Sequence, residues 1–294
     1  MNILDYYSQQ STVSDPQKYE AYFKNLPPDI KKLVKVVQGF ITHRDSSELY
    51  RLELTEERKQ EGEARYVPKI IKKILQHDNE PLNVGRTPDK RFSGVCRDFE
   101  IVLTSILRSK GIPARLRCGF AGYFSDTYED HWLTEYWNKN EKRWVLVDAN
   151  VDEVEREAYH VTIDINDVPY GPYLFAGDVW LQCRQSKLDP NKFGVSSIGA
   201  QGMWFIRNNV IRDLAALNKV EVLPWDEWGL ADKEFEDMTE AELKIIDEAA
   251  RLTINNDRFE EMKVFYEDQT LLKAPRVINS HTTYSGLQKV ELKI

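Results

Sequence analysis

Gly94-Val95-Cys96-Arg97-Asp98-Phe99 is the most informative segment of the chain, because it places a cysteine at the start of an apolar helix. The apolar residues after it recur at spacings of three and four, as on one helix face: Phe99, Val102, Leu103, Ile106 and Leu107. Gly111 is predicted to end this helix and Ser93 to cap its start. A thiol in a first helical turn lies at the positive end of the helix dipole, which favours the thiolate. The segment therefore suggests a nucleophile, although a lone cysteine is more often a small buried apolar residue.

Composition narrows the classes of function. The chain has 294 residues and a formal net charge of −8, which argues against a nucleic-acid surface. No apolar run reaches the roughly 20 residues that span a membrane, and the first residues lack the pattern of a signal peptide. Three widely spaced cysteines form no disulfide framework and no C-x-x-C pair. We therefore expect a cytoplasmic protein without nucleic-acid or membrane partners.

After Gly111 the apolar pattern changes from the period of a helix to the alternation of a strand. Residues 114–120 alternate, with Cys118 on the apolar face and therefore predicted to be core. Two runs rich in aromatic and β-branched residues follow, 131–137 and 143–150, and they predict a hairpin. Beyond about residue 165 the pattern becomes irregular, with helices predicted at 208–218 and after Thr239.

The hairpin bears on the chemistry, because side chains alternate along a strand. A four-residue loop over 138–141 would place His131 directly opposite Asp148. A six-residue loop would pair His131 with Asn150 and make Asp148 its diagonal neighbour. Either loop puts His131 and Asp148 on one face, with Cβ atoms roughly 5 to 7 Å apart.

A nucleophilic thiol needs a base, and the base needs a group that orients it. We expect His131 to take the proton of Cys96, and Asp148 to hold the imidazole in the right tautomer. The backbone N–H of Cys96 would then donate to the oxyanion formed when the thiolate attacks an amide carbon. These three residues are the predicted catalytic set.

At these positions the sequence resembles the transglutaminase-like superfamily, which has a papain-like core. The matching blocks are Gly94–Phe99, Gly111–Arg115, Asp130–Trp132 and Val145–Asn150. The resemblance implies that Cys96 is the nucleophile, His131 the base and Asp148 the third member. Later blocks at 193–194, 202–207 and 217–226 look similar to uncharacterised bacterial members.

The chain departs from the animal transglutaminases, which have Gln and Trp where Val95 and Arg97 flank Cys96 here. No acidic loop resembles their calcium sites, so protein cross-linking is not the specific expectation. The superfamily also includes proteases, deglycosylases and members without catalysis. Trp132, next to His131, is a candidate substrate-binding residue, with core packing as its alternative.

The remaining candidates are interpreted as structural. Arg97 and Asp98 belong to the first helical turn, and Cys183 has no histidine at ligand spacing, so zinc is not expected there. The histidines other than His131 lack clustering in the sequence and are interpreted as surface or capping residues: His43, His77, His160 and His281. We expect no cofactor and no metal.

The sequence thus predicts an α+β protein with a papain-like, transglutaminase-like core, in which the nucleophile helix packs on an antiparallel sheet. The expected divisions are a helical segment 1–60, the catalytic core 60–165, and an irregular α/β extension 166–294 packed on the core. The expected function is cysteine-dependent acyl transfer or amide hydrolysis, on a peptide or protein amide and with water or an amine as acceptor. The alternative is a catalytically silent peptide- or protein-binding module. Oligomeric state is left open.

Overall fold

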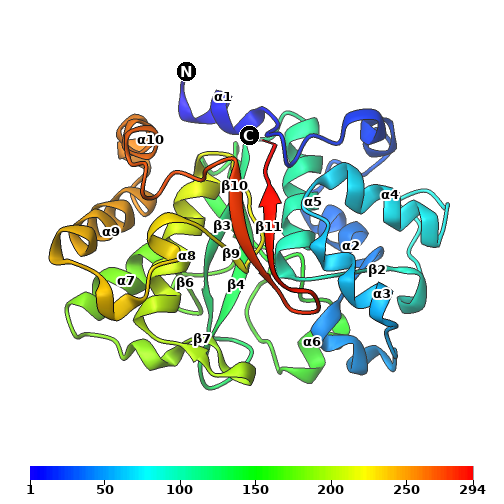
Figure 1. Cartoon of the computed structure of the whole chain (residues 1–294). Coiled ribbons are helices and arrows are strands. Elements are labelled where there is room, and N and C mark those ends of the chain that lie inside the picture. The colour runs from blue at the N-terminus through cyan, green and yellow to red at the C-terminus, as the bar shows by residue number, and fades with distance from the viewer. Residues whose placement is uncertain (294) are drawn as a thin grey trace. The chain divides into compact units, whose positions relative to one another are not determined.

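The computed structural model describes residues 1–293 and shows an α+β protein (Figure 1). The chain separates into two compact units. The first unit comprises Met1–Leu116 and Trp132–Pro169, and the second comprises Arg117–His131 and the chain from Tyr170 onward. Strands β3 (Ala114–Ala121) and β4 (Tyr128–Asn138) therefore each contribute residues to both units. The boundaries of these units differ from the division of the chain at residues 60 and 165 that the sequence predicts. That division into three segments stays a prediction.

The first unit is mainly helical. Its α-helices and strands are α1 (Ile3–Ser8), α2 (Ile30–Gln38), β1 (Ile41–His43), α3 (Glu56–Lys59), α4 (Val67–His77), β2 (Phe92–Gly94), α5 (Cys96–Ser109), β5 (Arg143–Val147) and α6 (Glu153–Ala158). Its 3₁₀ helices are η1 (Gln17–Phe23), η2 (Arg44–Tyr50), η3 (Gln60–Glu63) and η4 (Pro88–Lys90). Helices α1, α2 and α4 contact α5 (Figure 1). Strand β1 pairs in parallel with β2, the strand that leads into α5.

The predicted nucleophile helix is α5, and it begins at Cys96. Its N-cap is Val95, so the prediction of Ser93 as the cap is wrong. Ser93 lies in β2 opposite Thr42, and the pairing keeps it in a strand. Val95 has no side-chain acceptor; instead its own N–H donates to Asp98 Oδ2 at 2.9 Å. The helix ends as predicted, with Gly111 at φ +72° just after it.

The predicted hairpin is formed by β4 and β5, but its register corresponds to the longer of the two loops considered. Trp137 pairs with Trp144, and the ladder continues to Asn138 opposite Arg143. The register that placed His131 directly opposite Asp148 is therefore wrong.

Two local interactions explain this register. Asn138 Oδ1 accepts the N–H groups of Asn140 at 3.0 Å and Glu141 at 3.3 Å, which starts the turn after Asn138. The rings of Trp137 and Trp144 meet edge to face across the strands, with centroids 5.7 Å apart. The turn chemistry and the aromatic pair thus favour the same register.

The second unit combines a sheet with a group of helices. A six-stranded sheet has the order β6 (Tyr173–Phe175), β3, β4, β7 (Phe193–Val195) and β8 (Ala200–Gln201), and β5 pairs with β4 beside this path. Strands β4 and β7 are parallel. The helices of the second unit are α7 (Ala176–Arg184), α8 (Met203–Leu217), α9 (Glu240–Thr253) and α10 (Phe259–Asp268). Its 3₁₀ helices are η5 (Pro190–Lys192), η6 (Ser196–Ile198), η7 (Gly229–Ala231), η8 (Phe235–Asp237) and η9 (Asn256–Arg258). Helices α7, α8 and α9 contact one another (Figure 1).

A second, three-stranded sheet completes this unit. It has the order β11 (Gly286–Glu291), β10 (Val277–Thr282) and β9 (Asp226–Glu227), all antiparallel. Within residues 1–293, no helix is both long enough and apolar enough to cross a membrane.

Candidate active site

Cys96 is the first residue of α5 and is 7% exposed. It forms no disulfide. The backbone just before it is anchored, since Ser93 N–H donates to Glu61 Oε2 at 2.9 Å. The first residue of a helix carries partial positive charge on its N–H, which stabilises a nearby thiolate. Cys96 therefore has the local setting expected of a nucleophilic cysteine.

The first turn of α5 is held by two buried charged residues. Asp98 accepts the N–H of Val95, and Arg97 Nη1 lies 3.3 Å from Asp98 Oδ1. Arg97 Nη2 also donates to the carbonyl of Arg65 at 2.8 Å. Burial raises the pKa of Asp98 to about 6, against the opposing effect of Arg97. These contacts hold the first turn of α5, and the interpretation of both residues as structural stays a prediction.

Asp148 lies directly after β5 and is fully buried. The ladder between β4 and β5 ends at Val147. The N–H of Asp148 donates instead to the carbonyl of Ile165 at 2.8 Å. Its Oδ1 accepts the N–H groups of Asn150 at 2.9 Å and Val151 at 3.3 Å. The turn thus fixes the direction of this carboxyl group through its own backbone.

Glu100 is a residue of this region that the sequence reasoning missed. It lies one helical turn after Cys96 and is fully buried. Its Oε2 accepts the N–H of Thr134 at 2.9 Å and the hydroxyl of Thr134 at 2.6 Å, and its Oε1 accepts the N–H of Ala149 at 2.6 Å. Burial, and then the nearby Asp148, raise the pKa of Glu100 well above its usual value. Glu100 therefore connects α5, β4 and the turn at Asp148 within the first unit.

His131 belongs to the second unit, and the next residue of β4, Trp132, belongs to the first. His131 is 3% exposed, and its carbonyl accepts the hydroxyl of Tyr173 at 3.2 Å. Its ring lies edge to face against Phe124, with centroids 5.0 Å apart. The preceding Asp130 accepts the side-chain amide of Asn209 at 2.8 Å, and burial raises the pKa of Asp130. Cys96, Glu100 and Asp148 are thus placed in one unit and His131 in the other, so the predicted triad stays a prediction.

Trp132 is completely buried in the first unit. Its Nε1 has no hydrogen-bond partner among the residues described. A buried indole N–H without a partner is unusual, because the lost hydration is not replaced. The role of Trp132 in binding substrate stays a prediction.

A family model matches the segment of the chain that holds these residues. Residues 53–149 match the family model of the transglutaminase-like superfamily, and this segment is a transglutaminase-like core within an α+β fold. The segment includes all three predicted catalytic residues as well as Glu100. The resemblance to this superfamily and the predicted fold class are confirmed.

One solved structure is also similar to the chain, a protein from Cytophaga hutchinsonii described as a putative cysteine protease. The sequence identity is 17% and the TM-score 0.30, and the match covers 50% of this chain and 41% of that one. No curated protein matches the chain.

Proposed function

We propose that the chain is a cysteine-dependent enzyme that transfers or hydrolyses the acyl group of a peptide or protein amide. Cys96 is the nucleophile, His131 the base and Asp148 the residue that orients the base. The observation that carries the proposal is the position of Cys96 as first residue of the buried helix α5, inside the transglutaminase-like segment 53–149.

The proposed reaction has two stages. His131 accepts the thiol proton of Cys96, and the thiolate attacks the amide carbon while the N–H of Cys96 donates to the oxyanion. The carbon–nitrogen bond breaks, the leaving amine takes the proton from His131, and a thioester remains on Cys96. Water or a second amine, deprotonated by His131, then attacks the thioester and releases the thiol.

The first test is the alkylation rate of Cys96 at about pH 6, where an ordinary thiol is almost entirely protonated. Mass spectrometry can follow each cysteine after treatment with iodoacetamide. We expect Cys96 to react faster than a model thiol, and His131→Ala to slow this reaction. Cys183 serves as an internal control, because burial raises its pKa to about 12.

If Cys96 reacts no faster than the model thiol and His131→Ala changes nothing, the catalytic proposal is wrong and a silent binding module is the better description. If Cys96 is reactive, an amine-incorporation assay run beside a peptide-hydrolysis assay distinguishes a transferase from a hydrolase. Cys96→Ala is the negative control in both assays.

A further inference from the structure

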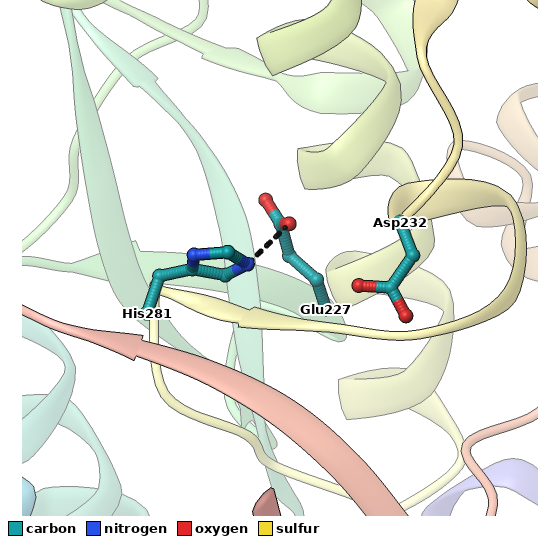
Figure 2. Close-up of side chains that lie close together, drawn as sticks. All are labelled: Glu227, Asp232 and His281. Atoms are coloured by element: carbon teal, nitrogen blue, oxygen red, sulfur yellow. Dashed lines mark ion pairs between the residues drawn. The ribbon is translucent and has the colours of Figure 1, made fainter. Parts of the chain in front are cut away.

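A cluster outside the proposed active site combines three side chains of the kinds that bind metals. Glu227 in β9, Asp232 after η7 and His281 in β10 all belong to the second unit. One potential ligand atom from each lies within 4.8 Å of the others. Figure 2 shows the three side chains converging from separate segments of the chain. The sequence interpretation treated His281 as a surface residue, since its neighbours in space are distant in sequence.

The backbone brings these residues together. Strand β10 pairs with β9 with Asn279 opposite Glu227, and the N–H of His281 donates to the carbonyl of Trp225 at 2.9 Å. His281 is two residues beyond Asn279, so it lies on the same face of β10 and diagonally across from Glu227. The sheet therefore positions the imidazole and this carboxylate.

Each carboxylate is also held by an amide from a neighbouring element. Asn208 in α8 donates to Glu227 Oε1 at 2.8 Å, and Asn279 donates to Asp232 Oδ2 at 3.0 Å. In metal sites, partners of this kind orient the ligating carboxylates by occupying one oxygen. The arrangement matches that requirement for both acidic residues.

The distances and charges also suit a divalent ion. His281 Nε2 lies 3.1 Å from Glu227 Oε2, close to the spacing of about 3.3 Å between neighbouring ligands of a tetrahedral ion bound at about 2.0–2.1 Å. Arg212 Nη2 is 3.6 Å from Glu227 Oε1 and partly offsets the two carboxylates. Arg207 also interacts electrostatically with Glu227, so the two arginines offset part of the charge that the two carboxylates would bring to a cation. The imidazole favours zinc and similar metals over calcium or magnesium.

We propose that Glu227, Asp232 and His281 form a site for a divalent transition metal, with Zn²⁺ as the best fit. The side chain of His281 is 52% exposed and that of Glu227 17%, so a bound ion exchanges with solution and keeps water as a further ligand. The ion would connect β9, the segment after η7 and β10. This site is independent of the proposed chemistry at Cys96.

The test uses the full chain carrying Cys96→Ala, because a reactive thiol would itself bind zinc. After treatment with a chelator, calorimetry with Zn²⁺ at about pH 7.5 should show one ion bound per chain. His281→Gln and Asp232→Asn should each weaken binding at least about tenfold. His160→Asn is the matched control for an exposed histidine, and it should bind as the parent does.

Thermal unfolding provides an independent measurement. Zn²⁺ should raise the melting temperature of the Cys96→Ala chain, because an ion that binds only the folded state stabilises that state. The melting temperature of the same chain with His281→Gln should not change. The proposal is wrong if no zinc binds, or if His281→Gln and Asp232→Asn bind zinc as tightly as the parent.

Discussion

Glu100 uses both oxygens of its buried carboxyl group as acceptors. One oxygen serves the backbone and side chain of Thr134, and the other serves the N–H of Ala149. Ala149 directly follows Asp148, so Glu100 fixes the turn of that residue against the helix that begins at Cys96. We infer that Glu100 is a positioning residue for the proposed site.

Replacing Glu100 with Gln should lower the free energy of unfolding by about 1–3 kcal/mol, the cost of a buried donor without a partner. The amide has a single acceptor oxygen, so it cannot serve the N–H groups of both Thr134 and Ala149. Urea denaturation measures the change. Glu153→Gln is the control, since Glu153 is exposed and pairs with Lys35 at the surface. Equal stabilities of the two variants would contradict this role.

The sequence could suggest Cys96, His131 and Asp148 as a catalytic set, because a thiol nucleophile requires a base and the base requires an orienting carboxylate. It could not indicate Glu100 in the same way. On a helix with one apolar face, a glutamate next to Phe99 would simply face water. In the structure α5 is buried along its length, from Cys96 to Arg108, so each polar side chain needs a partner.

At the scale of the secondary structure elements, the start of α5 depends on Asp98. Asp98→Ala removes the acceptor of the Val95 N–H and leaves the buried guanidinium of Arg97 without its neighbouring carboxylate. We expect a loss of about 2–4 kcal/mol in the free energy of unfolding. Alkylation of Cys96 should also slow, because the first turn frays.

Chemical denaturation and mass spectrometry would measure these two effects. Asp98→Asn is the matched variant, because it keeps one acceptor oxygen for Val95 and should lose less stability. If Asp98→Ala is as stable as the original chain, the start of α5 is held by other contacts.

The elements themselves were largely predictable, but their boundaries depended on local chemistry. The helix after Cys96 and the hairpin followed from periodicity. The N-cap at Val95 did not follow from periodicity, because the side chain of Asp98, three residues later, accepts the N–H of Val95. The hairpin register was left between two loops, and the Asn138 side chain decides it by accepting from the turn. Such interactions are specific to the folded chain, and apolar patterns alone do not contain them.

At the scale of the whole molecule, contacts distant in sequence determine the units. Arg117 makes a bidentate pair with Asp213, at 3.1 Å and 2.9 Å, and Asp213 also accepts the N–H of Cys118. This buried pair connects β3 to α8, so residues 117–131 group with the chain from Tyr170 onward.

In the sequence, Arg115 and Arg117 alternate with the apolar residues of β3. In the structure Arg115 pairs with Glu135 at 2.6 Å, and Arg117 pairs with Asp213. Both arginines are buried, and Cys118 is buried as predicted. A strand pattern alone cannot tell whether a polar face meets water or a charged partner, because the partner lies elsewhere in the chain.

The pH dependence of stability gives a prediction for the chain as a whole, through Glu155. Its carboxyl group accepts the side-chain amide of Asn150 at 2.9 Å. Burial, followed by the charges of Asp152 and Asp148, raises the pKa of Glu155 to about 8. The folded state therefore keeps this proton at pH values where the unfolded chain, with a carboxyl pKa near 4.5, has released it.

This difference in pKa sets the direction in which the free energy of unfolding changes with pH. The stabilisation by Glu155 is complete at low pH and is lost as the pH rises from about 4.5 to about 8, by at most about 1.4 kcal/mol for each pH unit. Glu155→Gln keeps an acceptor for Asn150 and cannot ionise, so its stability should fall less over this range. Urea denaturation of both proteins at several pH values gives the difference. Because Asp98 and Glu100 are unchanged in both, the difference isolates Glu155, and parallel pH profiles would show that this residue does not hold the proton.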